Sequence, residues 1–385
     1  MARPLHQLVA TNSEVMRPTF VEVDLGRISA NLAAIRSHVS PSTKVMAIVK
    51  ANAYGHGIVE VARLMEKQRA DMLGVAFLEE AVLLREHGIT APILVFGGIA
   101  QKQIPLILKL GLSATAPSVD KLRLIDEAAG ALGIRARVHL KIDTGMERIG
   151  VHYYSADKLL EASLSCRHCD VEGIYSHFAN ADAADLTHAR LQQQRFMEVL
   201  EFYTKRSLPP PCRHLANSAG VLALPESHLD MVRPGIMLYG VYPSPETPKT
   251  VPVHPALSWR SHVAYFKVVQ AGSPVSYGST WAPEQQTRVV TVPLGYGDGY
   301  FRALSGKAQM LIRGHRYPIV GRVCMDQTML DLGTGTAYNG DPVTIIGSDE
   351  KEAISADEIA SWAGTIPYEV LTNINTRVPR VYLGA

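Results

Sequence analysis

Cysteine is scarce in this sequence, and so is an excess of charge of either sign. Four cysteines in 385 residues are too few for a small scaffold held by disulfides. The 38 basic residues nearly balance the 36 acidic ones, which argues against a nucleic-acid binder, because such proteins cluster basic residues. The chain also lacks a run of 18 apolar residues, and its N-terminus lacks an apolar segment followed by a small-residue cleavage site. We therefore expect neither membrane insertion nor secretion, and we predict a cytoplasmic protein with reduced thiols.

One short motif contains two of the four cysteines. Cys166 and Cys169 enclose Arg167 and His168 in a C-R-H-C pattern. A structural zinc site usually pairs such a motif with a second one at similar spacing. No second pair exists, so we expect no bound metal.

From about residue 20 to 240, short apolar runs alternate with segments of helical period, beginning with an amphipathic helix through Leu25, Ile28, Leu32 and Ile35. Eight strands are expected, at Val45–Lys50, Met72–Phe77, Ile93–Phe96, Leu112–Thr115, Ala136–Ile142, Val171–Ser176, Arg213–Ala216 and His228–Arg233. The clearest helices between them are Ile58–Glu66, Glu79–His87, Val119–Leu132 and Leu186–Lys205. This α/β alternation predicts a (β/α)8 TIM barrel over residues 19–250. A doubly wound open sheet is the alternative, although the first strand lacks the G-x-G-x-x-G turn of dinucleotide-binding sheets.

The character of the sequence changes near residue 243. The segment 243–255, PSPETPKTVPVHP, is rich in proline and indicates a linker. The residues after it contain short β-branched runs punctuated by glycine, with one clear helix at Ser355–Ala363. We predict a C-terminal, mostly β domain over residues 251–385 and an N-terminal extension over residues 1–18. An early strand over residues 19–25 precedes the first barrel helix and is a candidate for pairing with the second domain.

The first expected barrel strand ends in a lysine, Lys50, within the segment KANAYGHG. Active sites of barrels lie at the C-terminal ends of the strands, where desolvation lowers the pKa of a lysine. A neutral amine there can attack an aldehyde and form a Schiff base. The structural alternative is a lysine whose apolar stem is buried while its charge reaches water.

Polar groups also follow the fifth to eighth expected strands, and each has a structural explanation of its own. Arg148 and Arg233 would commonly pair with surface acids, His177 would be a hydrogen-bonded core residue, and Asn217–Ser218 would cap a helix. A short helical turn after Pro234–Gly235, near Ser218, would instead offer amides to a phosphate. Five polar groups at five strand ends favour a common site over five separate explanations.

Ten segments, in this order along the chain, resemble the alanine racemases, a family of enzymes that use pyridoxal phosphate. They are KANAYGHG (50–57), KIDTGMERIG (141–150), SHFA (176–179), ANSA (216–219), MVRPGI (231–236), VSYG (275–278), GYGDG (295–299), GRVCMDQ (321–327), PYE (367–369) and RVPR (377–380). The resemblance implies a (β/α)8 barrel with a C-terminal β domain and a homodimer whose active site is shared between subunits. It also implies interconversion of L- and D-alanine through a pyridoxal-phosphate aldimine, which supplies D-alanine for peptidoglycan.

The resemblance assigns roles to single residues. Lys50 would be the Schiff-base lysine and one catalytic base, and Tyr277 the other base, with His177 hydrogen-bonded to it. Arg233 would face the pyridine nitrogen, and Arg148 the phenolic oxygen and the substrate carboxylate. The remaining implied residues are the phosphate ligands Tyr54, Asn217, Ser218, Gly235, Ile236 and Tyr368, the substrate contacts Met325 and Asp326, the entrance residue Tyr296, and Lys141, a site of carbamylation.

Racemisation explains why these residue types are needed. The proton leaves one face of Cα and returns on the other, so two bases are required, while the cofactor delocalises the carbanion's charge. A free tyrosine has a pKa near 10, so neighbouring donors such as His177 and Arg233 must stabilise its phenolate. Glu147 departs from the family pattern and raises the question of whether it competes for Arg148.

Three alternatives remain open from the sequence. A racemase of broader specificity would share every motif. A barrel-type decarboxylase of basic amino acids would share the lysine and use a second-domain cysteine, for which Cys324 is the candidate. A cofactor-carrying protein without catalytic activity would need only the barrel, and the residues after the linker argue against it.

Overall fold

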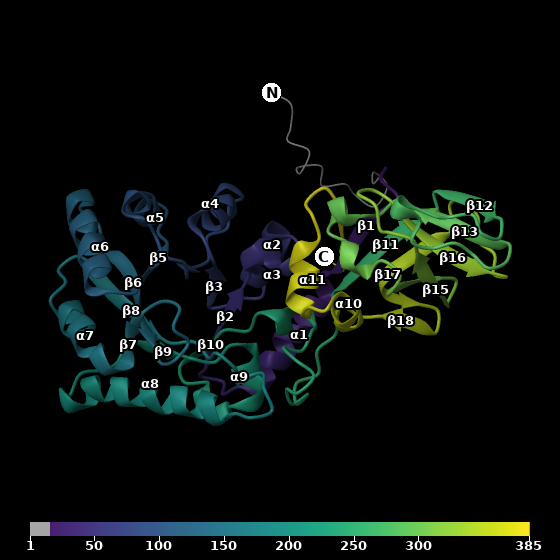
Figure 1. The fold of residues 1–385 in the computed structure, drawn as a ribbon. Helices are drawn as coiled ribbons and strands as arrows, with labels where there is room; N and C mark the ends of the chain where they lie inside the picture. The colour runs from purple at the N-terminus through teal and green to yellow at the C-terminus, as the bar shows by residue number, and fades with distance from the viewer. Residues whose placement is uncertain (1–15, 385) are drawn as a thin grey trace. The chain divides into compact units, whose positions relative to one another are not determined.

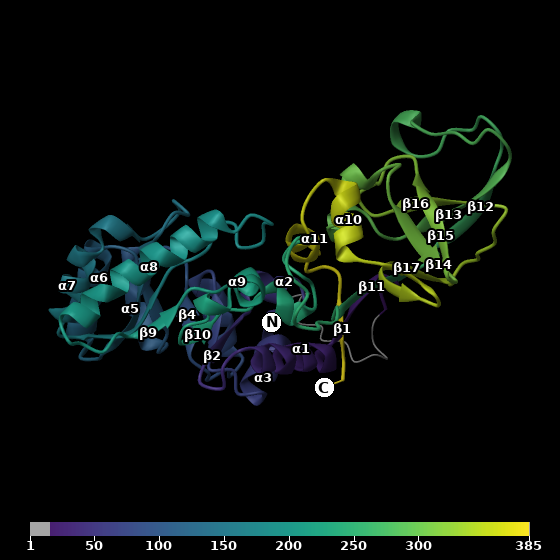
Figure 2. The same cartoon turned by 90° about the horizontal axis from the view of Figure 1, so that it is seen from below.

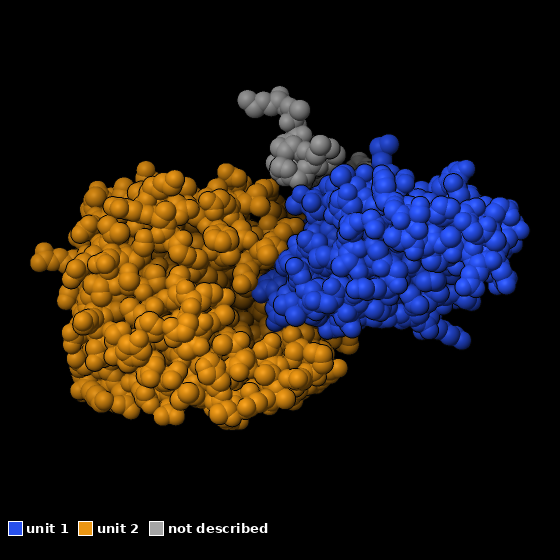
Figure 3. Space-filling model, viewed as in Figure 1, with its two compact units in different colours: residues 1–27, 54–56, 255–385 blue, residues 28–53, 57–254 orange. Residues whose placement is uncertain are grey.

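The computed structural model describes residues 16–384, which divide into two compact units (Figure 3). One unit consists of residues 28–53 and 57–254. The other consists, among the described residues, of 16–27, 54–56 and 255–384. Residues 54–56 therefore belong to a different unit from the residues on either side of them in the chain.

The first unit is built on a nearly closed ring of eight parallel strands (Figure 1). In ring order they are β10 (Met231–Val232), β2 (Lys44–Ile48), β3 (Met72–Val75), β4 (Ile93–Val95), β5 (Ser113–Ala116), β6 (Ala136–Asp143), β8 (Cys169–Tyr175) and β9 (Cys212–His214), with the short β7 (Val151–His152) beside β6. An isolated parallel bridge between Asn217 and Arg233 lies where β9 and β10 would complete the ring. The barrel prediction is confirmed. The open sheet is excluded because the first and last strands of the order, β10 and β9, meet at this bridge.

Helices surround the strands in the alternation expected from the sequence (Figures 1 and 2). They are α1 (Leu25–His38), α2 (Lys50–Tyr54), α3 (Ile58–Lys67), α4 (Leu78–Glu86), α5 (Ile104–Lys109), α6 (Val119–Leu132), α7 (Asp157–Leu164), α8 (Thr187–Lys205) and α9 (Ser218–Ala223). Helix α6 shows the local signals well: the Ser118 side chain accepts a hydrogen bond from the Lys121 amide at its start, and Gly133 ends it in the left-handed conformation.

All eight strands differ from their predicted bounds by a few residues, and two of the differences bear on the site. Strand β2 ends at Ile48, so Lys50 does not close the strand but begins the next segment, α2. Strand β10 contains only Met231 and Val232, because a 3-10 turn, η4 (Pro225–Ser227), occupies the chain just before it. Both differences move the polar residues off the strands and into the loops at their ends.

The second unit is a mostly antiparallel β domain. Its main sheet has the order β12 (Tyr265–Val269), β13 (Thr287–Val292), β16 (Thr328–Gly333), β15 (His315–Val320), β14 (Gln309–Ile312), β17 (Pro342–Asp349), β11 (Leu257–His262), β1 (Phe20–Asp24) and β19 (Arg380–Leu383), and β18 (Glu352–Ile354) pairs with β17. The early strand β1 pairs antiparallel with β11 and parallel with β19. Helix α10 (Ala356–Ala363) matches the expected helix, whereas α11 (Pro367–Asn373) was not predicted.

Among residues 16–384, no helix is both long and apolar enough to cross a membrane.

Candidate active site

The segment after Lys50 is a left-handed turn. Ala51, Asn52, Ala53 and Tyr54 all have φ between 51° and 53°, a conformation that costs an L-residue about 1–2 kcal/mol. The Ala51 amide donates to the Glu80 carboxylate at 2.6 Å, and the Asn52 side chain accepts from the Ile58 amide at 2.9 Å. Several consecutive strained residues held by such contacts are typical of a functional site.

Lys50 itself is half-buried among cations. Burial lowers its pKa from the ordinary value, Arg148 and Arg233 lower it further, and Glu80 opposes them. A lysine with a lowered pKa holds more of its neutral, nucleophilic form near neutral pH. The prediction of a desolvated lysine at the mouth of the barrel therefore has a physical basis in the described residues.

Arg233 lies at the centre of the hydrogen bonds around this site. Its guanidinium, 3% exposed, donates to the carbonyl oxygens of Ser176 (2.8 Å) and Leu215 (2.9 Å) and to ring nitrogens of His177 (3.1 Å) and His214 (3.0 Å). Burial lowers its pKa to about 10, so it remains protonated at neutral pH. No described residue accepts a hydrogen bond from its Nε–H, which leaves that donor of a fixed cation available to a ligand.

The contacts of Arg233 fix the tautomers of neighbouring histidines. An arginine only donates, so His177 and His214 each accept at Nδ1 and carry their proton on Nε2. The His214 Nε2–H then donates to Nδ1 of His139, 2.9 Å away. Burial and Arg233 lower the pKa of His177 and His214 well below the ordinary value. His177 is therefore a neutral donor through Nε2.

Lys141 is buried, 4% exposed, and its only hydrogen bond to a described residue is to the Ile142 carbonyl at 3.2 Å. Its ammonium nitrogen lies 4.8 Å from the centre of the Tyr175 ring. Burial, Arg233 and Arg148 lower its pKa well below the ordinary value, and Asp143 opposes them. Burial therefore favours the neutral form of this amine.

Two groups of predicted phosphate ligands are each assembled locally. In the barrel unit, the Ser218 hydroxyl accepts from the Gly235 amide at 2.8 Å, so its own proton is left to donate. The expected turn after Gly235 is η5 (Ile236–Tyr239), whose first amides have no partner within the turn, and Asn217 caps α9 instead. In the other unit, the Tyr54 and Tyr368 rings lie 6.1 Å apart between centroids.

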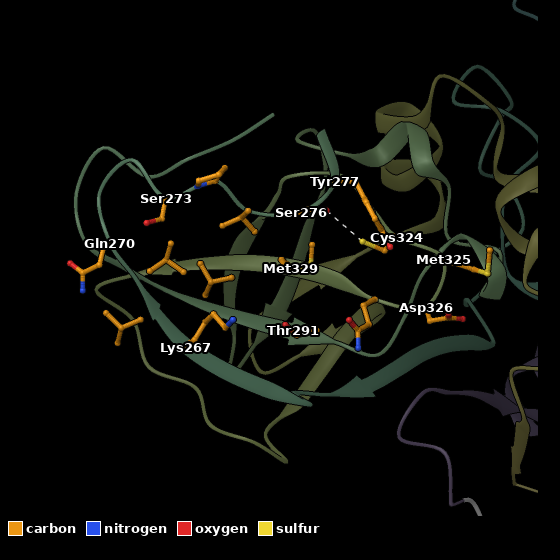
Figure 4. A pocket seen from close by; sticks show the side chains of 16 residues that line it. Lys267, Gln270, Ser273, Ser276, Tyr277, Thr291, Cys324, Met325, Asp326 and Met329 are labelled. Atoms are coloured by element: carbon orange, nitrogen blue, oxygen red, sulfur yellow. Dashed lines mark hydrogen bonds between the residues drawn. The ribbon is translucent and has the colours of Figure 1, made fainter. Parts of the chain in front are cut away.

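The β-domain residues of the predicted site line a groove of about 980 Å³ (Figure 4). Tyr277, Cys324, Met325 and Asp326 lie around one end of it. Tyr277 is 72% exposed and Met325 53% exposed, and both line this groove. These β-domain side chains are therefore exposed, whereas Arg233 and Lys141 of the barrel site are buried.

A network unforeseen from the sequence holds the Met325 loop. The amides of Tyr296 and Gly297 donate to the carbonyl oxygens of Cys324 (3.0 Å) and Met325 (2.9 Å). Asp298, buried in the same GYGDG segment, accepts from Arg377 at 2.7 Å, and Arg377 also donates to Asp326 at 2.8 Å. Arg377, the first residue of the RVPR motif, therefore positions the Met325 loop by pairing with Asp298 and Asp326.

The structure also answers the question about Glu147. Its carboxylate is 2.8 Å from Nε2 of His152, on the exposed side of the loop, so Glu147 has a partner other than Arg148. Glu80, His139 and His214 were missed, since nothing in their local sequence distinguishes them from ordinary helix and strand residues.

Known proteins match the chain over nearly its whole length. Family models described as alanine racemase, N-terminal domain and alanine racemase, C-terminal domain match residues 23–243 and 256–382. An alanine racemase of Carboxydothermus hydrogenoformans is 43% identical over 96% of this chain and 100% of its own length. The solved alanine racemase of a D-cycloserine-producing Streptomyces lavendulae is 38% identical with a TM-score of 0.92, covering 97% of this chain and 98% of that one. That of Bartonella henselae, described with covalently bound pyridoxal phosphate, is 28% identical with a TM-score of 0.86, covering 95% and 99%.

Proposed function

Because the chain belongs to the alanine racemase family, we propose that it interconverts L- and D-alanine with pyridoxal phosphate as its cofactor. The observation that carries the proposal is the buried Arg233, which fixes a neutral His177 and leaves its Nε–H unused beside the desolvated Lys50. The substrate is inferred from the names of the relatives, and these contacts explain how the site could bind the cofactor and move a proton.

The donor set fits the cofactor. A phosphate needs hydrogen-bond donors, and Ser218 retains its hydroxyl proton beside the first amides of η5. The pyridine nitrogen needs one donor, and the Arg233 Nε–H is available. Lys50, with its lowered pKa, would hold the cofactor covalently. When bound, pyridoxal phosphate serves as a sink for the electron pair left on Cα.

Two bases would then act on opposite faces of Cα. The Lys50 amine, once released, takes or returns the proton on one face, and the Tyr277 hydroxyl does so on the other. The His177 Nε2–H is the donor that would stabilise the Tyr277 phenolate, since Arg233 occupies Nδ1. Because a protonated arginine does not yield its proton, Arg233 would keep the pyridine nitrogen unprotonated and limit the lifetime of the carbanion.

Arg148 and the Met325 loop would bind the substrate carboxylate, with Asp326 beside it and Tyr296 at the entrance. We further propose that Lys141 is carbamylated: its neutral amine adds to carbon dioxide and releases one proton. The product is an anion near Arg233 and Arg148, two cations whose charges act on Lys141 and are opposed there by Asp143. Because Glu147 pairs with His152, it does not replace this anion.

We propose a homodimer in which the Tyr277 surface of one subunit completes the barrel site of the other. The exposure of Tyr277 and Met325 supports this, since large apolar side chains at the surface mark interaction sites. A symmetric dimer has two copies of each contact and therefore two shared sites. Production of D-alanine for peptidoglycan in the cytoplasm is the role that this activity suits.

Replacement of Lys50 tests the proposal. Lys50→Ala should lower the rate of racemisation, followed by chiral chromatography from L- and from D-alanine, by at least about 10²-fold. It should also lose cofactor on gel filtration. Lys44→Ala, at the other end of β2 and exposed, should match the wild type in both assays. Full racemisation by Lys50→Ala would contradict the assignment, and release of carbon dioxide from ornithine, lysine or arginine would favour a decarboxylase.

A further inference from the structure

Three potential metal ligands meet at a second place in the barrel unit. Asp126 of α6, Cys166 after α7 and Cys169 at the start of β8 have ligand atoms within 4.8 Å of one another. Cys169 begins the strand whose far end leads to His177, so the cluster lies at the opposite end of the barrel strands from the proposed catalytic site. Nothing in the proposed racemisation uses these three residues.

The spacing is close to that of a tetrahedral zinc site. With Zn–S bonds of about 2.3 Å, the ligand atoms of such a site lie roughly 3.8 Å apart. The cluster, within 4.8 Å, needs a contraction of about 1 Å at most, which side-chain rotation can supply. Two thiolates and a carboxylate are also ligand types that zinc accepts.

The carboxylate is already held toward the thiols by the loop between them. The amide of His168 donates to Asp126 at 2.7 Å, and the amide of Arg167 donates at 3.4 Å. The two residues between the cysteines therefore wrap around Asp126. Hydrogen bonds of this kind to a ligating carboxylate orient it and are common around metal sites.

The three side chains are buried to different extents. Cys169 is buried, whereas Cys166 and Asp126 are half-buried, so an ion has access from solvent on one side.

We propose that Asp126, Cys166 and Cys169 form a structural site for Zn²⁺, with a water molecule as the fourth ligand. Binding deprotonates both thiols and releases two protons, and the resulting charge of −1 is spread over three ligands and one dication. The ion links α6 to the loop before β8, two segments that otherwise meet through backbone-to-carboxylate bonds. The proposal departs from the expectation of no bound metal, because its third ligand is a carboxylate on α6 and not a second cysteine pair.

The experiment uses the full-length, cofactor-loaded protein, reduced with a phosphine, treated with a chelator and desalted. Zn²⁺ is added in competition with a chromophoric zinc chelator, and zinc retained after desalting is counted by mass spectrometry. The variants are Cys166→Ser, Cys169→Ser and Asp126→Asn. Cys212→Ser, which removes another half-buried cysteine at the start of β9, is the matched control.

The wild type and Cys212→Ser should retain one equivalent of zinc and melt at a higher temperature with Zn²⁺ than without it, since an ion that binds only the folded state stabilises it. Cys166→Ser and Asp126→Asn should bind at least about 10-fold more weakly and lose the shift in melting temperature. Racemisation by both variants should be unchanged. These half-buried positions decide the outcome if Cys169→Ser fails to fold. Failure of the wild type to bind zinc, or wild-type affinity in Cys166→Ser and Asp126→Asn, would overturn the proposal and leave the proposed racemase activity untouched.

Discussion

The two units present their share of the site in opposite ways. In the barrel unit Arg233 and Lys141 are 3% and 4% exposed, whereas in the β domain Tyr277 and Met325 are 72% and 53% exposed. Burial alters chemistry directly, because it changes which protonation state a group prefers. The fold of the barrel unit thus sets the protonation of its groups, while these β-domain side chains remain exposed.

The two units also differ in the hydrogen-bond partners of their arginines. Arg233 has no acidic partner among the described residues, and it satisfies its buried donors with two carbonyl oxygens and two neutral histidines. The β domain instead pairs its arginine with acids, as Arg377 does with Asp298 and Asp326. Arg233 therefore keeps its positive charge without an acidic partner among the described residues, whereas Arg377, which holds the Met325 loop, is neutralised by two carboxylates.

The largest expected effect concerns Tyr277, the catalytic base that we assign to the β domain. Tyr277→Phe should slow exchange of the Cα proton from one enantiomer of alanine by about 10²–10⁴-fold, while exchange from the other enantiomer falls much less. Deuterium exchange measured separately for each enantiomer gives the two rates.

Tyr265→Phe is the matched control, since Tyr265 is also an exposed tyrosine of the β domain and should behave as the wild type. Thermal stability should be unchanged in Tyr265→Phe, because this side chain is exposed. Equal losses in both directions of exchange would contradict a two-base division between the units.

A second prediction concerns the acid sensitivity of the barrel. The pKa values of buried His139 and His214 are lowered, so below about pH 6.5 the unfolded chain binds protons that the folded barrel excludes. Each histidine should then reduce the free energy of unfolding by about 1.4 kcal/mol per pH unit as the pH falls. Urea unfolding between pH 7.5 and 5, monitored by far-ultraviolet circular dichroism, measures the slope.

His214→Asn removes one of these groups and should make the slope shallower by up to about 1.4 kcal/mol per pH unit, whatever it does to stability at pH 7.5. The exposed His315 supplies a control, because His315→Asn should leave the slope alone. A pH-independent stability in the wild type would show that the two histidines are not held neutral by the fold.

The smallest predicted effect tests the strained turn after Lys50. Ala51 is exposed and has φ 53°, so Ala51→Gly should stabilise the protein by about 1 kcal/mol by removing the left-handed penalty. Ala33→Gly, at an exposed position inside the right-handed helix α1, should destabilise it by about 0.5–1 kcal/mol. Chemical denaturation measures both changes, and a loss of stability in Ala51→Gly would show that the turn is not strained.

The barrel was predictable because parallel strands covered on both faces appear as short apolar runs, and all eight runs became strands. The residues at strand ends were predictable as a group for the same reason. The left-handed turn was not, since Ala-Asn-Ala carries no glycine to mark it and the contact with Glu80 is made by a distant helix. The fixed tautomers of His177 and His214 likewise depend on three loops that only the fold brings together around Arg233. The Asp298–Arg377 pair joins residues 79 positions apart, a contact without a local signal.

The central claim is that a prepared barrel site is completed by the exposed tyrosine of a second subunit, and mixing two inactive variants tests it most directly. Lys50→Ala and Tyr277→Phe are unfolded together in equal amounts, refolded with pyridoxal phosphate and assayed for racemisation. Random pairing makes half of the dimers mixed, and one of the two sites in each then has both bases, so about a quarter of wild-type activity should return. If the mixture stays as inactive as either variant alone, although the same procedure restores the wild type, Lys50 and Tyr277 do not act across a subunit boundary.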